Sequence, residues 1–122
     1  MKKLRFIQPI PRFNKSLESI TNKLNIKPNI KPNIKPNVIY EKLKVLCDSP
    51  ELGLLIPRTK ALRKYRTSLP SHIKKKRLRF IYYVTEGVII PLDIYYKGDR
   101  DDLSVEDIKA IRKELEDYLK GS

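Results

Sequence analysis

Lysine and arginine residues are concentrated in the middle of this chain. Ten of them lie between Arg58 and Arg79, and no Asp or Glu interrupts that stretch. By contrast, the segment from Asp99 to Asp117 contains eight acids and four bases. Closely spaced cations can hold phosphate groups and can stabilise the negative charge that develops when a phosphodiester is cleaved. The chemistry indicated by this pattern is therefore the binding or cleavage of nucleic acid.

The sequence lacks the residues that most other kinds of active site need. The four glycines are scattered, so there is no glycine-rich phosphate loop. One histidine and one cysteine, His72 and Cys47, cannot form a usual zinc site, and a ribonuclease with two histidines is excluded. Acids at Asp99, Asp101 and Asp102 are better explained by the dipole of a following helix than by magnesium. The sequence therefore predicts neither a metal nor a cofactor.

The composition is that of one globular domain with a large positive charge. The chain has 122 residues, 40% of them hydrophobic, and a formal net charge of +13 at pH 7. Such a charge suits a phosphate-rich or acidic partner, while solubility or thermal adaptation is the simpler alternative. A single cysteine excludes an internal disulfide, and no apolar run approaches the ~18 residues of a membrane span. We expect one cytoplasmic domain over residues 1–122, with no membrane contact.

The N-terminal half is predicted to form a short strand and two helices. The strand runs from Leu4 to Ile10 and stops at a pair of prolines. Two sets of apolar residues at helical spacing follow it, namely Phe13, Leu17, Ile20 and Leu24, then Ile39, Leu43 and Leu46. Asn37 is the expected N-cap of the second helix.

Three tandem IKPN repeats separate these two helices. Each proline fixes φ and lacks an N–H, and each lysine before a proline is pushed toward extended geometry. We therefore interpret residues 25–37 as a Pro/Lys/Asn linker of polyproline or turn character.

The C-terminal half is predicted to form three strands and a helix. The strands are Ala61–Ser68, Leu78–Val84 and Val88–Lys97, and a tight turn joins the last two into a hairpin. Pro91 requires either a bulge or a strand edge. Ser104 and Asp107 form a capping box, after which Ile108, Ile111, Leu115 and Tyr118 make an apolar stripe. The expected fold is α+β, a small antiparallel sheet with two N-terminal helices and a C-terminal helix packed on it.

Strand alternation divides the side chains between two sheet faces. We expect the core face to carry Phe80, Tyr82, Val84, Ile90, Leu92, Ile94 and Tyr96. The opposite face is expected to carry Arg79, Ile81, Tyr83, Asp93, Tyr95 and Lys97, and in the first strand Lys64 and Arg66 alternate with Arg63 and Tyr65. Cations and tyrosines on one face suit RNA, although a solvated face with extended cations explains the pattern equally well.

Three motifs resemble the RelE/ParE toxins of type II toxin–antitoxin systems. Leu62-Arg63-Lys64-Tyr65-Arg66 resembles the family's basic strand, and Arg79-Phe80-Ile81-Tyr82 resembles its strand of arginine, two hydrophobic residues and tyrosine. Ile94-Tyr95-Tyr96-Lys97 followed by Asp101-Asp102-Leu103-Ser104 resembles the close of the HigB-like branch. The likeness covers most of the chain apart from the IKPN repeats.

The resemblance implies a metal-independent, ribosome-dependent mRNA endoribonuclease that inhibits translation and arrests growth. It assigns phosphate binding to Lys64 and Arg66, transition-state stabilisation to Arg79, a place near the 2′-hydroxyl to Lys97 and a late basic position to Arg100. Further RNA contacts are expected from Arg63, Lys74, Lys75, Lys76, Arg77 and Tyr95, the last by stacking on a base. The implied partners are the ribosome, mRNA and an acidic antitoxin protein that forms a hetero-oligomer with the toxin.

Two alternatives stay open. A ParE-like toxin shares the fold but binds gyrase and does not cut RNA. A basic nucleic-acid-binding protein would hold RNA or DNA on the same strands without cleavage.

Overall fold

The computed structural model describes residues 6–26, 36–59, 61–68, 77–85, 87–96 and 103–121. Its helices are α1 (Pro11–Ile26), α2 (Pro36–Asp48) and α3 (Val105–Gly121), with a 3-10 turn η1 (Pro50–Leu52) after α2. Its strands are β1 (Phe6–Ile7), β2 (Leu54–Leu55), β3 (Arg63–Ser68), β4 (Arg77–Thr85) and β5 (Val88–Tyr96). Residues 27–35, which include most of the IKPN linker, and the predicted turn residue Glu86 lie outside the described residues.

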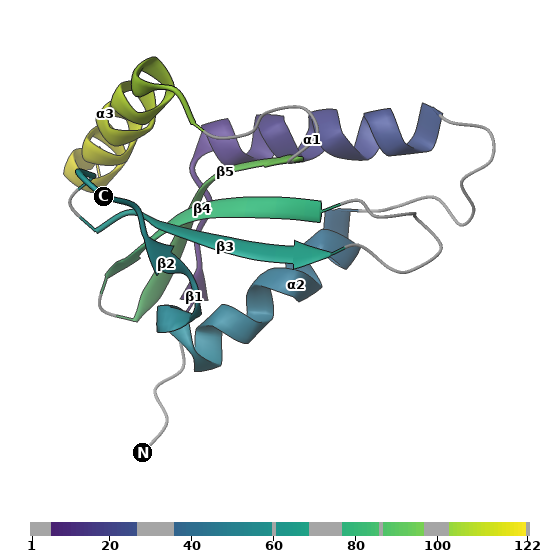
Figure 1. Cartoon of the computed structure of the whole chain (residues 1–122), viewed down its shortest axis with the longest axis horizontal. Coiled ribbons are helices and arrows are strands. Elements are labelled where there is room, and N and C mark those ends of the chain that lie inside the picture. Colours follow the sequence, from purple (N-terminus) through teal and green to yellow (C-terminus); the bar gives the residue numbers. More distant parts are fainter. Residues whose placement is uncertain are drawn as a thin grey trace.

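The strands form one sheet in the order β1-β5-β4-β3-β2 (Figure 1). Four of them are antiparallel to their neighbours, while β1 pairs in parallel with β5 through Phe6 with Val88 and Ile7 with Ile89. The first and last strands of the chain are therefore neighbours. The α+β class predicted from the sequence is confirmed. Among the described residues of the predicted strand Leu4–Ile10, Phe6–Ile7 form β1, whereas β2 was not predicted.

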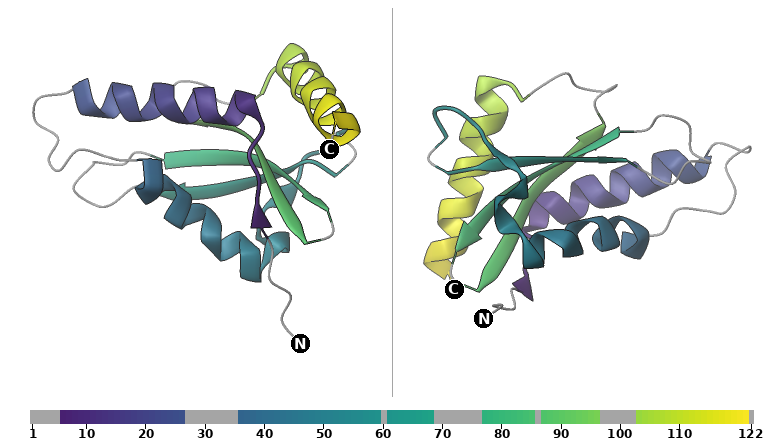
Figure 2. Two further views of the ribbon diagram at one scale, coloured as in Figure 1. Left: turned by 180° about the vertical axis from the view of Figure 1, so that it is seen from behind. Right: turned by 60° about the horizontal axis from the view of Figure 1, so that its bottom comes forward.

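α1 and α2 pack on the sheet face that bears Phe80. The Phe13 ring of α1 lies 6.3 Å from the Phe80 ring and 6.1 Å from the Tyr40 ring of α2. Figure 2 shows these two helices beside each other and α3 apart from them, near one end of the strands. α3 buries Ile111 and Leu115. The sheet thus carries helices on both sides, and α3 lies on the face opposite Phe80.

Both N-terminal helices follow the predicted apolar spacing. The side chains of Phe13, Leu17 and Ile20 in α1 are at most 5% exposed, and Ile39, Leu43 and Leu46 in α2 are fully buried. The predicted start of α2 is wrong by two residues, because α2 begins at Pro36 and Asn37 is its second residue rather than its cap. Proline suits the first turn of a helix, where its missing N–H removes no hydrogen bond.

Of the two alternatives predicted for Pro91, a bulge or a strand edge, the structure shows a bulge next to it. The β4–β5 register passes from Ile81 opposite Asp93 to Tyr82 opposite Pro91, so Leu92 is the extra residue. This insertion reverses the alternation toward the hairpin, where Ile90 lies opposite Tyr83. Ile90 therefore shares a face with Tyr83 and not with Phe80, which corrects the face predicted from strict alternation.

The sheet face opposite Phe80 is more enclosed than the sequence pattern predicts. Ile81 and Asp93 have no exposed surface, and Arg79 and Tyr95 are 7% and 2% exposed. Solvent reaches this face mainly at Lys64, Arg66 and Arg77, which are half-buried or exposed. Among the described helices, none has the length and apolar character that a membrane crossing requires.

Candidate nucleic-acid interface

Four basic residues gather on the sheet face opposite Phe80. Arg66 of β3 lies directly opposite Arg79 of β4 in the strand register. Lys64 and Arg77 are each two residues away from one of these arginines, so their side chains project from the same face. We call Lys64, Arg66, Arg77 and Arg79 the cationic face. Pleated-strand geometry places neighbouring members of this set about 5–7 Å apart at their backbones.

The cationic face brings positive side chains together on neighbouring strands. Like charges directly opposite each other on neighbouring strands destabilise a sheet by up to about 1 kcal/mol. In the described part of the chain, Arg66 and Arg77 form no ion pair that would offset this repulsion. An anion placed over the four side chains would remove the cost, so the arrangement is suited to phosphate.

Burial of Arg79 gives it a different environment from its neighbours. Its side chain lies in the floor of the face, between Arg66 on one strand and Tyr95 on the other. A guanidinium in a partly desolvated position interacts more strongly with a nearby anion than one in water. Arg79 can therefore stabilise developing negative charge, while the exposed Arg66 and Arg77 can bind and orient phosphate groups.

Arg63, a predicted RNA contact, lies apart from the cationic face. Arg63 pairs with Tyr82 and so points to the sheet face of Phe80, away from the cationic face. Its guanidinium donates hydrogen bonds to the carbonyl oxygens of Gly53 at 2.6 Å and Glu51 at 3.3 Å. Arg63 thus fixes η1 and β2 against the sheet, a structural use that strand alternation alone did not reveal.

Tyr95 lies on the cationic face as predicted, but it is enclosed. It is opposite Arg79 in the register, and only 2% of it is exposed. A base could not stack on its ring in this arrangement, which corrects the open face expected from the sequence. The remaining predicted site residues, Lys74, Lys75, Lys76, Lys97 and Arg100, lie outside the described residues.

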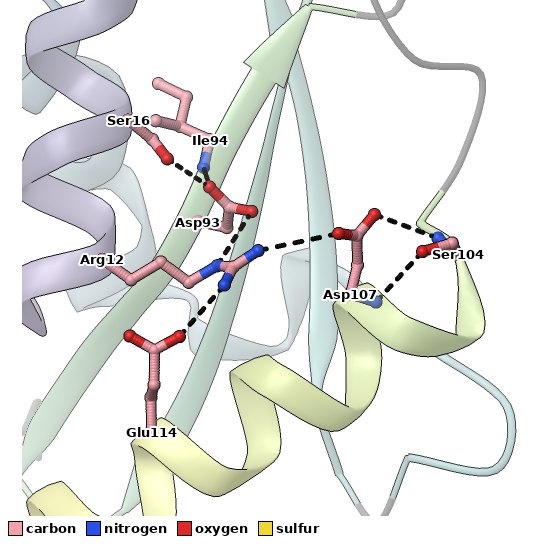
Figure 3. A network of polar contacts seen from close by, with 7 residues as sticks. All are labelled: Arg12, Ser16, Asp93, Ile94, Ser104, Asp107 and Glu114. Atoms are coloured by element: carbon pink, nitrogen blue, oxygen red, sulfur yellow. Dashed lines mark hydrogen bonds and ion pairs between the residues drawn. The ribbon is translucent and has the colours of Figure 1, made fainter.

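A partly buried polar network lies beside the cationic face and joins three elements (Figure 3). Its centre is Asp93 of β5, which accepts hydrogen bonds from Ser16 Oγ at 2.6 Å and from Arg12 Nε at 3.3 Å. The Arg12 guanidinium also contacts Glu114 at 3.0 Å and Asp107 at 3.8 Å, both on α3. One arginine of α1 therefore holds the sheet and the last helix together.

The electrostatics of Arg12 follow from these partners. Burial alone lowers the pKa of a guanidinium, but the hydrogen bond to Glu114 and the charges of Asp93 and Glu114 raise the pKa of Arg12 above its ordinary value. Arg12 is therefore always charged, and it neutralises acids that would otherwise place negative potential near Arg79. Sequence reasoning missed this network, although one acid in an otherwise apolar strand is a signal that a buried partner exists.

The capping box predicted for α3 is present at the edge of the same network. Asp107 N donates to Ser104 Oγ at 3.0 Å, and Ser104 N donates to the Asp107 carboxylate at 3.2 Å. Asp107 thus serves the helix end and Arg12 together (Figure 3). Within the described part of the chain, no group of three or more metal-ligating side chains occurs.

Comparisons with known proteins concern the fold. A scan against models of protein families found no match, and a search of curated proteins found no similar sequence. A search of solved structures found E. coli toxin RelE in the free state, as a mutant with two arginines changed to alanine. The superposition covers 94% of this chain and 98% of that chain, with a TM-score of 0.56 and 12% sequence identity. The chain has a RelE-like fold. At this identity the likeness describes the architecture alone.

Proposed function

We propose that this protein is the toxin of a toxin–antitoxin pair and that it cleaves mRNA on the ribosome. The observation that carries the proposal is the cationic face, in which Arg66 and Arg79 stand opposite each other on neighbouring strands of a RelE-like fold. Two arginines in this register repel each other, and both attract an anion placed over them. The motifs that resemble RelE/ParE toxins supply two of the strands that form this face.

The proposed roles follow the exposure of each side chain. Lys64 and Arg66 hold the phosphates on either side of the scissile bond, with Arg77 at the next position along β4. Arg79, which lies deeper, stabilises the charge that develops on the phosphodiester. The resemblance adds Lys97 near the 2′-hydroxyl and Arg100, together with Lys74, Lys75 and Lys76 as further RNA contacts. No metal ion takes part in this proposal.

The same charges bear on the partners of the protein. A formal net charge of +13 favours an acidic antitoxin that covers the cationic face and withholds it from RNA. The two proteins would form a hetero-oligomer in the cytoplasm, where the toxin meets ribosomes. Opposite charges steer association, so the association rate should fall as salt concentration rises.

The decisive experiment is induced expression followed by mapping of mRNA 5′ ends. We expect cuts in phase with codons for the unmodified protein, and a loss of about 10²–10³ in cleavage rate for Arg79→Met. Methionine is used because alanine at a side chain that is only 7% exposed would also leave a cavity. Arg66→Ala tests the exposed partner without this complication.

Lys109→Ala is the matched control, because it removes one positive charge from an exposed position on α3. This variant should retain full cleavage and growth arrest. Intact mRNA accompanied by DNA damage would contradict the proposal and would favour a ParE-like action on gyrase. Nucleic-acid binding without any cleavage would reduce the function to that of a basic binding protein.

A further inference from the structure

A cavity of about 200 Å³ lies where α3 meets the beginning of β3 and the end of β4. Its apolar lining consists of Leu62 and Tyr83 from the sheet and Leu115 and Leu119 from α3. Leu119 is 41% exposed, so part of this lining is open to solvent. The cavity is smaller than the roughly 300 Å³ of sites for drug-sized ligands, so it suits a single ring system.

This cavity continues the cationic face along the strands. Leu62 is two residues before Lys64, and Tyr83 is two residues after Ile81, the register partner of Lys64. Side chains two residues apart in a strand share a face and are separated by about 7 Å. The cavity therefore begins about 7 Å from Lys64 and about 13 Å from Arg66 along β3. An extended RNA strand would cover these distances with about one or two nucleotides.

We propose that this cavity is a base-specificity subsite that holds one unstacked nucleobase of single-stranded RNA while the phosphates lie on the cationic face. The inference rests on the proposed function and adds the part of the site that distinguishes one RNA sequence from another. Single-stranded RNA is recognised through splayed bases that meet an aromatic ring and are hydrogen-bonded at their edges. Tyr83 supplies the ring, and its side chain is half-buried in the cavity wall.

Two charged residues supply the groups that could bind a base edge. Arg112 and Glu116 of α3 line the cavity, one with hydrogen-bond donors only and the other with acceptors only. They stand four residues apart, a spacing at which such residues often pair, yet they form no ion pair with each other in the described part of the chain. Both head groups are therefore open to a ligand that offers an acceptor beside a donor, as every nucleobase does.

A peptide side chain is the other candidate occupant, and the structure favours it less. An apolar anchor residue needs a dry pocket and has no use for a donor and an acceptor at the rim. The position of the cavity in line with four cations also suits a polyanion that bears a ring on every repeat. The base is therefore the occupant that uses all the observed features of the cavity.

The test is fluorescence anisotropy with short single-stranded RNAs that differ at one base. We expect the full-length protein to prefer one base by about tenfold, the size of a good pair of base-edge hydrogen bonds. Arg112→Met and Glu116→Gln should abolish this preference and leave the dependence of affinity on salt almost unchanged. Arg66→Ala should do the opposite, lowering the slope of log affinity against log salt by about one while the preference stays.

Lys109→Met and Glu106→Gln are matched controls, because both change the same kinds of side chain at exposed positions of α3 away from the cavity. Both should bind like the unmodified protein. RNA binding in which the cavity variants keep the base preference, or in which the unmodified protein has none, would overturn the subsite alone. A protein that binds none of these RNAs would overturn the subsite, while codon-phased mRNA cuts, or their absence, would still decide the proposed function separately. A leucine-containing acidic peptide could instead bind the unmodified protein but not the cavity variants, while RNA binding is the same for all of them. That result would overturn the subsite and identify the cavity as a protein-binding pocket.

Discussion

At the scale of single residues, Tyr82 holds η1 and β2 in place, two elements that were not predicted from the sequence. Its hydroxyl donates to Pro50 O at 2.6 Å and accepts from Gly53 N at 2.9 Å. With the Arg63 contacts to Gly53 and Glu51, these bonds attach η1 and β2 to the sheet. A residue without a side chain is required at position 53, because the Tyr82 ring lies directly over it.

Gly53→Ala tests this close approach. An added Cβ would lie 2.5 Å from Tyr82 Oη and 2.6 Å from Tyr82 Cε1, and both atoms belong to a side chain with no exposed surface. We expect a loss of about 1–3 kcal/mol in the free energy of unfolding, because a packed core resists an inserted methyl group. Gly121→Ala is the control, since no atom lies within 4 Å of its added Cβ. Equal denaturation midpoints for the two variants would refute the proposed contact.

Tyr82 should also make the stability of the fold depend on pH in the alkaline range. Burial raises the pKa of Tyr82 above its ordinary value of 10.0, while the hydrogen bond from Gly53 opposes this rise. The folded state therefore retains the phenol proton where the unfolded state has lost it, so stability is complete below pH 10 and falls as pH rises above it. Burial also raises the pKa of Tyr40. In urea titrations between pH 8 and 11, Tyr82→Phe should be less stable than the native protein at pH 8 but should show a shallower alkaline decline.

At the scale of elements, α3 is held to the rest of the molecule by charge as well as by packing. It buries only Ile111 and Leu115, while Arg12 joins it to Asp93 through Glu114 and Asp107. Tyr118 adds a hydrogen bond from its hydroxyl to Gln8 at 2.8 Å. The last helix thus depends on residues near the beginning of the chain.

Arg12→Met and Glu114→Gln should therefore have unequal effects on stability. Removing Arg12 takes a paired positive charge away from the fully buried Asp93 carboxylate, which should cost about 3 kcal/mol. Glu114 is 40% exposed, and its loss should cost less than about 1 kcal/mol because water screens such a pair. Denaturation midpoints measure both changes. A cost for Glu114→Gln equal to that of Arg12→Met would show that the network is held from α3 and not from Asp93.

The sequence predicts elements better than it predicts contacts between them. The positions of α1, α2, β4 and β5 follow from local spacing, because the period of apolar residues reflects the face that each element buries. The strand predicted at Leu4–Ile10 is found as β1, whereas the two residues of β2 have no period to detect. The Arg12–Glu114 contact joins residues 102 positions apart, and no local rule connects them.

The candidate site shows the same division. Alternation correctly placed Lys64, Arg66 and Arg79 on one face, because the register between β3 and β4 is regular. It failed for Ile90, beyond the bulge at Pro91, and it did not foresee the burial of Arg79 and Tyr95. Burial depends on what lies over a strand, and the strand's own sequence does not contain that information.

At the scale of the whole molecule, the IKPN repeats are expected to be dispensable for stability. Deleting residues 27–30 removes one repeat from the connection between α1 and α2, and the free energy of loop closure varies only with the logarithm of length. We expect a change below about 1 kcal/mol in unfolding free energy and unchanged RNA binding. Leu43→Ala, which empties a fully buried position of α2, should cost about 2–5 kcal/mol and calibrates the assay. A deletion as damaging as Leu43→Ala would mean that the repeats pack on the domain.

The pairing of β1 with β5 has a consequence for the order of events during synthesis. β1 is synthesised before its only described neighbour, which is not available until Val88 and Ile89 have left the ribosome. Arg12 can contact Glu114 only later still, because Glu114 is synthesised after β5. The native sheet and its final helix therefore close only after nearly all of the chain is free, since long-range pairings form late and slowly. A nascent copy would therefore emerge from the ribosome before β1 has its neighbour and before Arg12 has its contact with α3.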